Sequence, residues 1–447
     1  MTEAQQSDPV STKQQRIAGL AGRRPQEGFT ALNHHLDRAW LVEASNRTRK
    51  DAAPGVDGQT AQAYGLQLLE NLQGLLRRAQ SGTYRASPVR RVHIAKGTGK
   101  ELRPLGIPTL ADKILQRAVA TVLEPVDAQD FLDGSYGFRP GRSAHQALPA
   151  VWQQALDLGG CWLVEVDIQR FFDTRDRAHR RTFLQQRVRD GVLPRLIGKW
   201  RQAGILAEGE LVHAEAGTPQ GGVISPLLAN VYLHYLVDVW FAQAVKPCLK
   251  GRAFLVRYAD DLVMGFACEA DARRVLDVLP KRFGKYGLTL HPEKTRLVRF
   301  VRPGGRPTGT GASQGVSPES FDFLGFTHYW SRSKKGSWVI KHKTARGRLR
   351  RALRKVADWF RRHLHEPIAV QYRALQQELR GHYQYCGVVG NGRSLWCFRE
   401  RLQEVWQKWL SRRRRGGGMT WERMSQLLRG LPLLKPPAWV APCVAKP

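Results

Sequence analysis

The sequence lacks the features that mark secreted, disulfide-stabilised or membrane-spanning proteins. Its six cysteines form no Cys-x-x-Cys pair, so it predicts neither a disulfide framework nor a zinc site. The polar N-terminal segment contains no apolar signal-peptide core, and we therefore expect no secretory signal. The most apolar stretch, residues 222–241, is interrupted by Ser225, Pro226, Asn230, His234 and Asp238. This pattern is typical of a buried core helix and not of a membrane span.

Acidic residues are scarce relative to basic ones. The 447 residues contain 38 Asp and Glu against 71 Lys and Arg, which gives a net charge of +33. Such an excess indicates a polyanionic partner. An anionic membrane surface is the less favoured partner, because the basic residues are scattered through segments that look folded and no lipidation motif is present. We expect a protein of a reducing compartment that binds nucleic acid and no membrane.

The chain divides into four predicted segments. Residues 1–50 form an N-terminal extension, and we expect the polar residues 1–30 within it to be poorly ordered. Residues 51–330 alternate helix-like and strand-like patterns. Residues 331–430 have a helical pattern, and residues 431–447 form a short Pro-rich tail.

The helical segment concentrates the positive charge. Residues 331–430 contain 25 Lys and Arg against 6 Asp and Glu, together with six tryptophans. The run Arg412–Arg415 leads into three glycines and by itself is typical of a solvated face or a flexible tail. A basic helical domain with interleaved aromatic residues favours contact with an RNA or DNA backbone.

Three aspartates stand at the ends of apolar segments. Asp260 and Asp261 lie side by side in RYADDLVMGF, and Asp167 ends the apolar stretch CWLVEVD. An ordinary hairpin with a polar turn is one interpretation of the adjacent pair. Carboxylates gathered at one sheet edge would repel each other unless a cation neutralised them, and Mg²⁺ binds carboxylates together with substrate phosphates. Combined with the basic charge, the pattern indicates a two-metal nucleotidyltransferase.

A series of motifs resembles the bacterial group II intron reverse transcriptase/maturase family over about residues 31–430. The matching stretches follow the order of that family: APGVDG, RRVHIAKGTGKELRPLGIPT, GSYGFRPGRSAHQAL, VEVDIQRFFD, GTPQGGVISPLLANVYLHYLVD, RYADDLVMGF, GLTLHPEKTR and FDFLGF. The resemblance implies an α+β right-hand polymerase with fingers and palm in 51–330 and an α-helical thumb/maturase domain in 331–430. It also implies that Asp167, Asp260 and Asp261 are the catalytic, metal-binding carboxylates.

The resemblance also implies a set of residues that bind the incoming dNTP. Phe172 matches a steric gate that excludes a ribose 2′-hydroxyl, and Gln220 matches a glutamine beside the nucleotide. Arg91 and Lys96 would contact the triphosphate as cations. Ala259 would allow close approach of the nucleotide, and a small residue at this position favours a retroelement-type enzyme over a domesticated one.

A second set of residues is implied to contact nucleic acid. Tyr258 would pack near the primer terminus, and Arg103 and Arg139 would contact template or nucleotide. The basic run Arg412, Arg413, Arg414 and Arg415 would contact phosphates of bound RNA.

The function implied is RNA-directed DNA synthesis with two Mg²⁺ ions, for which Mn²⁺ is a substitute. The partners implied are an RNA template, the parent intron RNA whose splicing and retrohoming the protein assists, a DNA primer or target, and dNTPs; no protein partner is evident. We expect a ribonucleoprotein in the bacterial cytoplasm. The HNH endonuclease domain of the family is not matched, so we expect no cleavage of a second DNA strand. The alternatives are a domesticated reverse transcriptase in DNA repair or phage defence, a non-catalytic RNA-binding splicing factor, and an RNA-dependent RNA polymerase, against which the aromatic gate argues.

Overall fold

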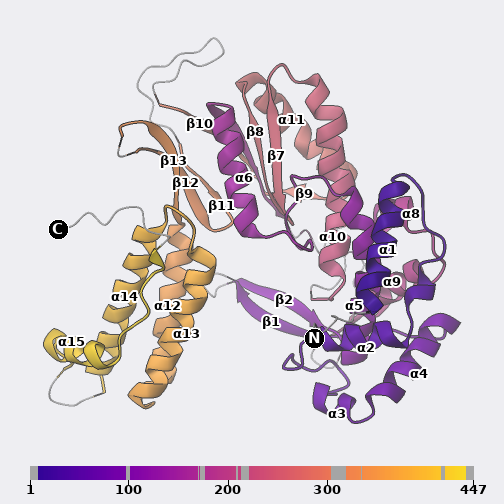
Figure 1. Cartoon of the computed structure of the whole chain (residues 1–447), viewed down its shortest axis with the longest axis horizontal. Helices are drawn as coiled ribbons and strands as arrows, with labels where there is room; N and C mark the ends of the chain where they lie inside the picture. Colours follow the sequence, from indigo (N-terminus) through magenta and orange to yellow (C-terminus); the bar gives the residue numbers. More distant parts are fainter. Residues whose placement is uncertain are drawn as a thin grey trace, which may run out of the picture. The chain divides into compact units, whose positions relative to one another are not determined.

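The computed structural model describes residues 9–96, 101–169, 171, 177–207, 210–212, 221–303, 319–333, 335–413 and 418–438. The chain forms two compact units, Met1–Leu297 and Val298–Pro447 (Figure 1). The division between them falls inside the segment predicted as fingers and palm. The four predicted segments therefore stay a prediction, and the two units are described separately.

One part of the first unit is a helical layer around the long, buried helix α5. The Thr109 hydroxyl caps α5 by accepting a hydrogen bond from the amide of Asp112, as expected of an N-cap threonine. Apolar side chains of the surrounding helices form one continuous core with it. The helices are α1 (Pro9–Arg23), α2 (Arg38–Asn46), α3 (Ala61–Gly65), α4 (Leu68–Ser81), α5 (Leu110–Asp130), α8 (Arg177–Arg187) and α9 (Leu193–Gln202).

Helix α1 corrects the prediction that residues 1–30 are poorly ordered. Val10, Ile17 and Ala21 are buried in the core that includes α5, and the Gln14 side chain donates to the Thr121 carbonyl of α5 at 3.1 Å. Their spacing of seven and four residues places them on one helical face. The prediction was wrong for residues 9–23, because three apolar residues on one face are enough to fix an otherwise polar helix.

Two sheets carry the strands predicted for this region. The first sheet contains the antiparallel pair β1 (Val89–Lys96) and β2 (Glu101–Ile107). Strand β1 also pairs in parallel with β5 (Ile205–Ala207), which continues to β6 (Glu210–Val212). The second sheet has the order β10-β3-β8-β7. Its strands are β3 (Gly160–Val166), β7 (Ala253–Tyr258), β8 (Asp261–Phe266) and β10 (Arg296–Val301), and a short pair, β4 (Ile168–Gln169) with β9 (Thr289–Leu290), follows β3.

Helices cover the second sheet. Side chains of α11 (Glu269–Lys285) and α10 (Ser225–Leu233) share a core with β3 and β8, and α6 (Ala144–Asp157) packs on β3 and β7. The apolar stretch 222–241 is confirmed as buried helix, since it forms α10 and continues through the wider, π-type turn His234–Asp238. Among the described residues, no helix is long and apolar enough to cross a membrane.

The second unit combines a small sheet with a helical bundle. The sheet contains β11 (Phe321–Phe323), β12 (Phe326–Arg332) and β13 (Trp338–Thr344) in antiparallel order. The helices are α12 (Arg346–Arg362), α13 (Ile368–Cys386), α14 (Gly392–Ser411) and α15 (Trp421–Gly430) (Figure 1). Their apolar faces meet in one core. The helical pattern predicted beyond residue 331 is thus confirmed from Arg346 onward.

Candidate active site

The adjacent aspartates lie at the tip of a hairpin. Strands β7 and β8 pair from Ala253 opposite Phe266 to Tyr258 opposite Asp261, which leaves Ala259 and Asp260 as a two-residue turn. The φ of Ala259 is 56°, in the left-handed region that a turn of this length uses and that glycine normally occupies. The turn therefore stores backbone strain at the predicted catalytic position.

The segment before α6 lies directly behind this turn. The amide of Arg257 donates to the Gly134 carbonyl, and the amide of Tyr136 donates to the Arg257 carbonyl, both at 2.8 Å. A Cβ on Gly137 would lie 2.3 Å from the Ala259 nitrogen. Only glycine fits at this close approach. Residues 134–137 therefore hold the backbone of the turn in position.

A fully buried arginine connects the turn to the rest of the unit. Arg257 has no exposed surface, and its guanidinium pairs with both carboxylate oxygens of Asp238 at 2.8 and 2.6 Å. The same guanidinium donates to the Ala259 carbonyl at 3.1 Å, the Asn230 side chain at 3.0 Å and the Ser135 hydroxyl at 2.8 Å. One side chain thus ties the turn, α10 and the segment before α6 together.

The ion pair is charged in the fold. Burial opposes ionisation of Asp238, but the positive charge and hydrogen bonds of Arg257 outweigh it and hold the pKa of Asp238 below its ordinary value. The amide of Asn230 completes the network by donating to the Gly137 carbonyl at 2.6 Å. Every hydrogen-bonding group described here has a partner, which is the condition for a buried pair to be tolerated.

The third aspartate comes from the neighbouring strand. Val166 pairs with Leu262, so the next residue, Asp167, is at the sheet edge level with Asp261. The Asp261 side chain reaches solvent, yet protein atoms crowd its carboxyl. This desolvation, followed by repulsion from Asp260 and then Asp167, raises the pKa of Asp261 to about 6. The structure thus places the carboxylates of Asp260 and Asp167 close enough to that of Asp261 to repel it.

The chemistry of the three carboxylates suits a divalent cation, but their arrangement among the described residues does not form a metal site. The Lys294 ammonium lies 3.0 Å from a carboxylate oxygen of Asp167 and also lowers the pKa of Asp261, so it acts as the counter-charge in this arrangement. In the part of the chain that the structure describes, no group of three His, Cys, Asp or Glu side chains is arranged to hold a metal ion. For the three carboxylates to bind one metal ion together, Asp167 would have to give up its ion pair with the Lys294 ammonium.

Several predicted nucleotide contacts lie on the β1–β2 hairpin. Among Arg91, Lys96 and Arg103, the structure describes the side chain of Arg91, which is half-buried. For Lys96 and Arg103 it describes the backbone alone, which pairs with Glu101 and Ile94, respectively. Phe172 and Gln220 lie outside the described residues. The roles predicted for all of these side chains stay predictions.

Two predicted nucleic-acid contacts lie beside the turn. The Tyr258 ring is 6.3 Å from that of the exposed Phe138, so an aromatic pair forms at the residue that precedes the turn. The Arg139 guanidinium donates to four main-chain carbonyls. These bonds organise the segment before α6, and the contact of Arg139 with template or nucleotide stays a prediction.

The basic run is described in its first half. Arg412 stacks on the Trp409 ring at 4.8 Å, and Arg413 donates to the His365 carbonyl at 3.0 Å. Arg414 and Arg415 lie outside the described residues. Phosphate binding by the run stays a prediction.

The supporting residues were not predicted as functional. The signal for two of them was present, because Asn230 and Asp238 interrupt an apolar helix, where unpaired polar side chains are costly. Arg257 precedes the motif as an isolated charge in a buried strand. Lys294 and Gly137 carry no such signal, since their roles depend on contacts with residues more than 100 positions away.

Comparison with known proteins decides the family. The model of the reverse transcriptase (RNA-dependent DNA polymerase) family matches residues 94–328. The chain is also 35% identical to Protein YkfC of Escherichia coli over 330 residues, which cover 64% of this chain and 84% of that protein. The chain belongs to the reverse transcriptase family.

Further relatives specify the type of reverse transcriptase. Group II intron-encoded protein LtrA of Lactococcus lactis is 36% identical over 233 residues, 51% of this chain and 38% of that protein. Nuclear intron maturase 2 of Arabidopsis thaliana is 27% identical over 234 residues, 43% of this chain and 30% of that protein. The predicted resemblance to group II intron reverse transcriptases, the α+β right-hand fold and the RNA-directed DNA polymerase class are confirmed. The two alternatives of a domesticated enzyme and a non-catalytic splicing factor are not favoured. Reverse transcriptases use divalent metal ions and bind RNA and DNA.

Proposed function

We propose that this reverse transcriptase extends a DNA primer on an RNA template at Asp167, Asp260 and Asp261, with two Mg²⁺ ions. The observation that supports this site is the strand register that places Asp167 level with Asp261, beside the turn that carries Asp260. Crowding and the two neighbouring carboxylates raise the pKa of Asp261 there to about 6. The neighbouring carboxylates repel each other, and this repulsion favours the binding of a divalent cation that neutralises their charge. The three carboxylates would hold Mg²⁺, which would supply activation of the primer 3′-hydroxyl and neutralisation of charge on the leaving pyrophosphate.

The protein residues have separate roles in this proposal. The Asp260 and Asp261 carboxylates are presented by the strained turn, and Arg257 holds the turn through the Ala259 carbonyl. Lys294 pairs with Asp167 at 3.0 Å and orients its carboxylate until the substrate complex forms. Arg91, Lys96 and Gln220 contact the nucleotide, and Mn²⁺ substitutes for Mg²⁺.

Primer extension tests the function directly. The full chain is incubated with a DNA primer on RNA or DNA template, with dNTPs or NTPs, in Mg²⁺ or in EDTA. We expect metal-dependent extension on RNA with dNTPs. Extension with NTPs in preference to dNTPs would identify an RNA polymerase instead.

Substitution of Phe172 tests nucleotide selection. If this ring clashes with a ribose 2′-hydroxyl, Phe172→Ala will raise the use of rNTPs relative to dNTPs, because the clash costs free energy only for the ribonucleotide. The measurement is the ratio of kcat/KM values for one rNTP and its dNTP, with Phe171→Leu, a change at a buried core position, as the control. An active Phe172→Ala enzyme with an unchanged ratio would assign Phe172 to the core.

We further propose that the protein binds its parent intron RNA, assists its splicing and retrohoming, and works as a ribonucleoprotein in the bacterial cytoplasm. The names of LtrA and of the Arabidopsis maturase support the proposal. In the second unit, Arg350, Arg351 and Arg354 of α12 are exposed, while Val356 and Phe360 of the same helix face the core. A basic face on a well-packed helix suits phosphate contact.

Neutralising the basic run tests the RNA-binding role of the second unit. Replacing Arg412–Arg415 by serine is expected to weaken binding of intron RNA and of an unrelated RNA alike. The slope of log K against log[salt] should fall by roughly 0.7–0.9 for each phosphate contact that is lost. Titrations at three salt concentrations measure this slope. Equal slopes for the variant and the wild type would show that the run contacts no phosphate and would direct the search to α12.

A further inference from the structure

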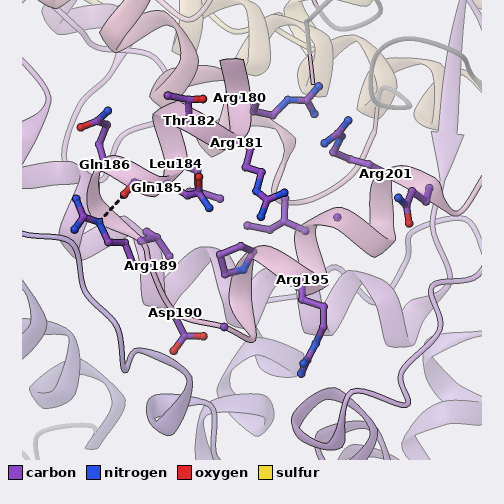
Figure 2. A pocket seen from close by; sticks show the side chains of 16 residues that line it. Arg180, Arg181, Thr182, Leu184, Gln185, Gln186, Arg189, Asp190, Arg195 and Arg201 are labelled. Atoms are coloured by element: carbon purple, nitrogen blue, oxygen red, sulfur yellow. Dashed lines mark hydrogen bonds between the residues drawn. The ribbon is translucent and has the colours of Figure 1, made fainter. Parts of the chain in front are cut away.

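A cleft between α8 and α9 has a strongly basic lining. Its volume is about 860 Å³, and its side chains come from both helices and from the connection between them (Figure 2). Five of the sixteen lining residues are arginines: Arg180, Arg181, Arg189, Arg195 and Arg201. The predicted polymerase residues are not among those that line it.

The acidic residue in the lining does not offset this charge. Asp190 is buried, and its carboxylate accepts four main-chain hydrogen bonds. The amides of Leu32 and Asn33 donate to one oxygen at 2.9 Å each, and those of Val192 and Leu193 donate to the other at 2.8 and 3.0 Å. Asp190 therefore fixes the start of α9, and among the described residues it forms no ion pair with Arg181, Arg189 or Arg195.

Three of the arginines are exposed and available to a ligand. Arg181, Arg189 and Arg195 have exposed side chains, and among the described residues none of them forms an ion pair with a carboxylate. The Arg189 Nε donates to the Gln185 carbonyl at 3.2 Å, as the dashed line in Figure 2 shows, and this bond orients its guanidinium. Arg180 and Arg201 take part in other interactions, so the inference rests on the three exposed arginines.

The remaining lining residues indicate what kind of anion fits. Leu184, Val188 and Ile197 belong to the helical core, so the cleft wall is rigid. No aromatic side chain is among the lining residues that the structure describes, and the cleft thus offers no surface on which a base could stack. Thr182, Gln185 and Gln186 add neutral hydrogen-bonding groups of the kind that contact ribose hydroxyls.

We propose that this cleft binds the phosphodiester backbone of structured RNA, at a site separate from the polymerase aspartates. Arginine forks match phosphate geometry, and recognition through backbone and ribose is how proteins bind A-form RNA without reading its bases. The proposal does not rest on polymerase chemistry at the aspartates, because it requires only that the protein bind RNA.

The test compares two triple variants of equal charge. Arg181, Arg189 and Arg195 are replaced by glutamine in the cleft variant, and the exposed Arg77, Arg85 and Arg274 are replaced by glutamine in the control. Binding of a blunt RNA hairpin to the full chain is titrated by fluorescence anisotropy at several salt concentrations. We expect the slope of log K against log[salt] to fall by roughly 0.7–0.9 per arginine in the cleft variant, and to change little in the control.

Two results would overturn the proposal. Equal changes in the two variants would show a general effect of net charge. Equal RNA binding by wild type and cleft variant, together with thermal stabilisation of the wild type alone by orthophosphate at constant ionic strength, would show a small-anion site. Thermal unfolding of each variant checks that it is folded, and primer extension by the wild type tests the polymerase function independently.

Discussion

Replacing Asp260 by asparagine is expected to abolish cDNA synthesis while leaving RNA affinity nearly unchanged. The amide keeps the size of the side chain but removes a negative charge from the turn, so the carboxylate set loses a metal ligand. Loss of one preorganised electrostatic group typically lowers kcat by about 10²–10³. RNA affinity depends on the net charge of +33, which one substitution barely alters. Primer extension and filter binding on the same preparation measure the two quantities.

A matched control separates the site from the surface. Asp277→Asn makes the same chemical change at an exposed position of α11 and should leave extension unaffected. Substantial extension by Asp260→Asn at saturating Mg²⁺ would remove Asp260 from the metal-binding set. Loss of RNA binding in parallel with activity would instead indicate that the variant is misfolded.

Breaking the buried ion pair behind the turn is expected to have the second large effect. Asp238→Leu leaves the Arg257 charge unpaired at a position with no exposed surface, and removal of one partner of a buried pair costs about 3–5 kcal/mol. The loss should appear as faster hydrogen exchange of β7 and β8 amides, measured by mass spectrometry. Removing the exposed Glu269–Arg273 pair of α11, 2.6 Å long, by Glu269→Gln should cost only about 0.3–0.5 kcal/mol.

A double variant distinguishes stability from positioning. Asp238→Leu combined with Arg257→Met removes both charges, and apolar replacement of a whole buried pair is often neutral for stability. We expect exchange protection to recover in part while the polymerase rate stays low, because methionine cannot donate to the Ala259 carbonyl. Recovery of both properties would show that Arg257 has no role in holding the turn.

The sequence was most informative where structure is local. The hairpin that carries Asp260 and Asp261, the strand that ends at Asp167 and the β1–β2 pair follow from alternating apolar residues and turn signals, which depend on neighbours in the chain. The stretch FDFLGFTHYW forms two strands, β11 and β12, because Leu324 and Gly325, with φ values of 51° and 79°, turn the chain between them. A leucine in the left-handed region gives no signal in the sequence.

The supporting contacts of the site are non-local and were therefore not predicted. Lys294 reaches Asp167 across 127 positions, and Gly137 meets Ala259 across 122. Neither residue type is unusual in its local context. Their importance arises from close approach in the fold, which single-sequence patterns do not encode.

The buried arginine behind the turn has a consequence for protein engineering. The four residues Tyr258–Asp261 are easily recognised and easily copied, but their backbone is fixed by a donor from β7, a carboxylate and an amide near α10, and a glycine before α6. A scaffold that received only the four-residue motif would display two carboxylates on an unsupported turn. A transplant that aims at polymerase activity must therefore include Arg257, Asp238, Asn230 and residues 134–137 as one functional module.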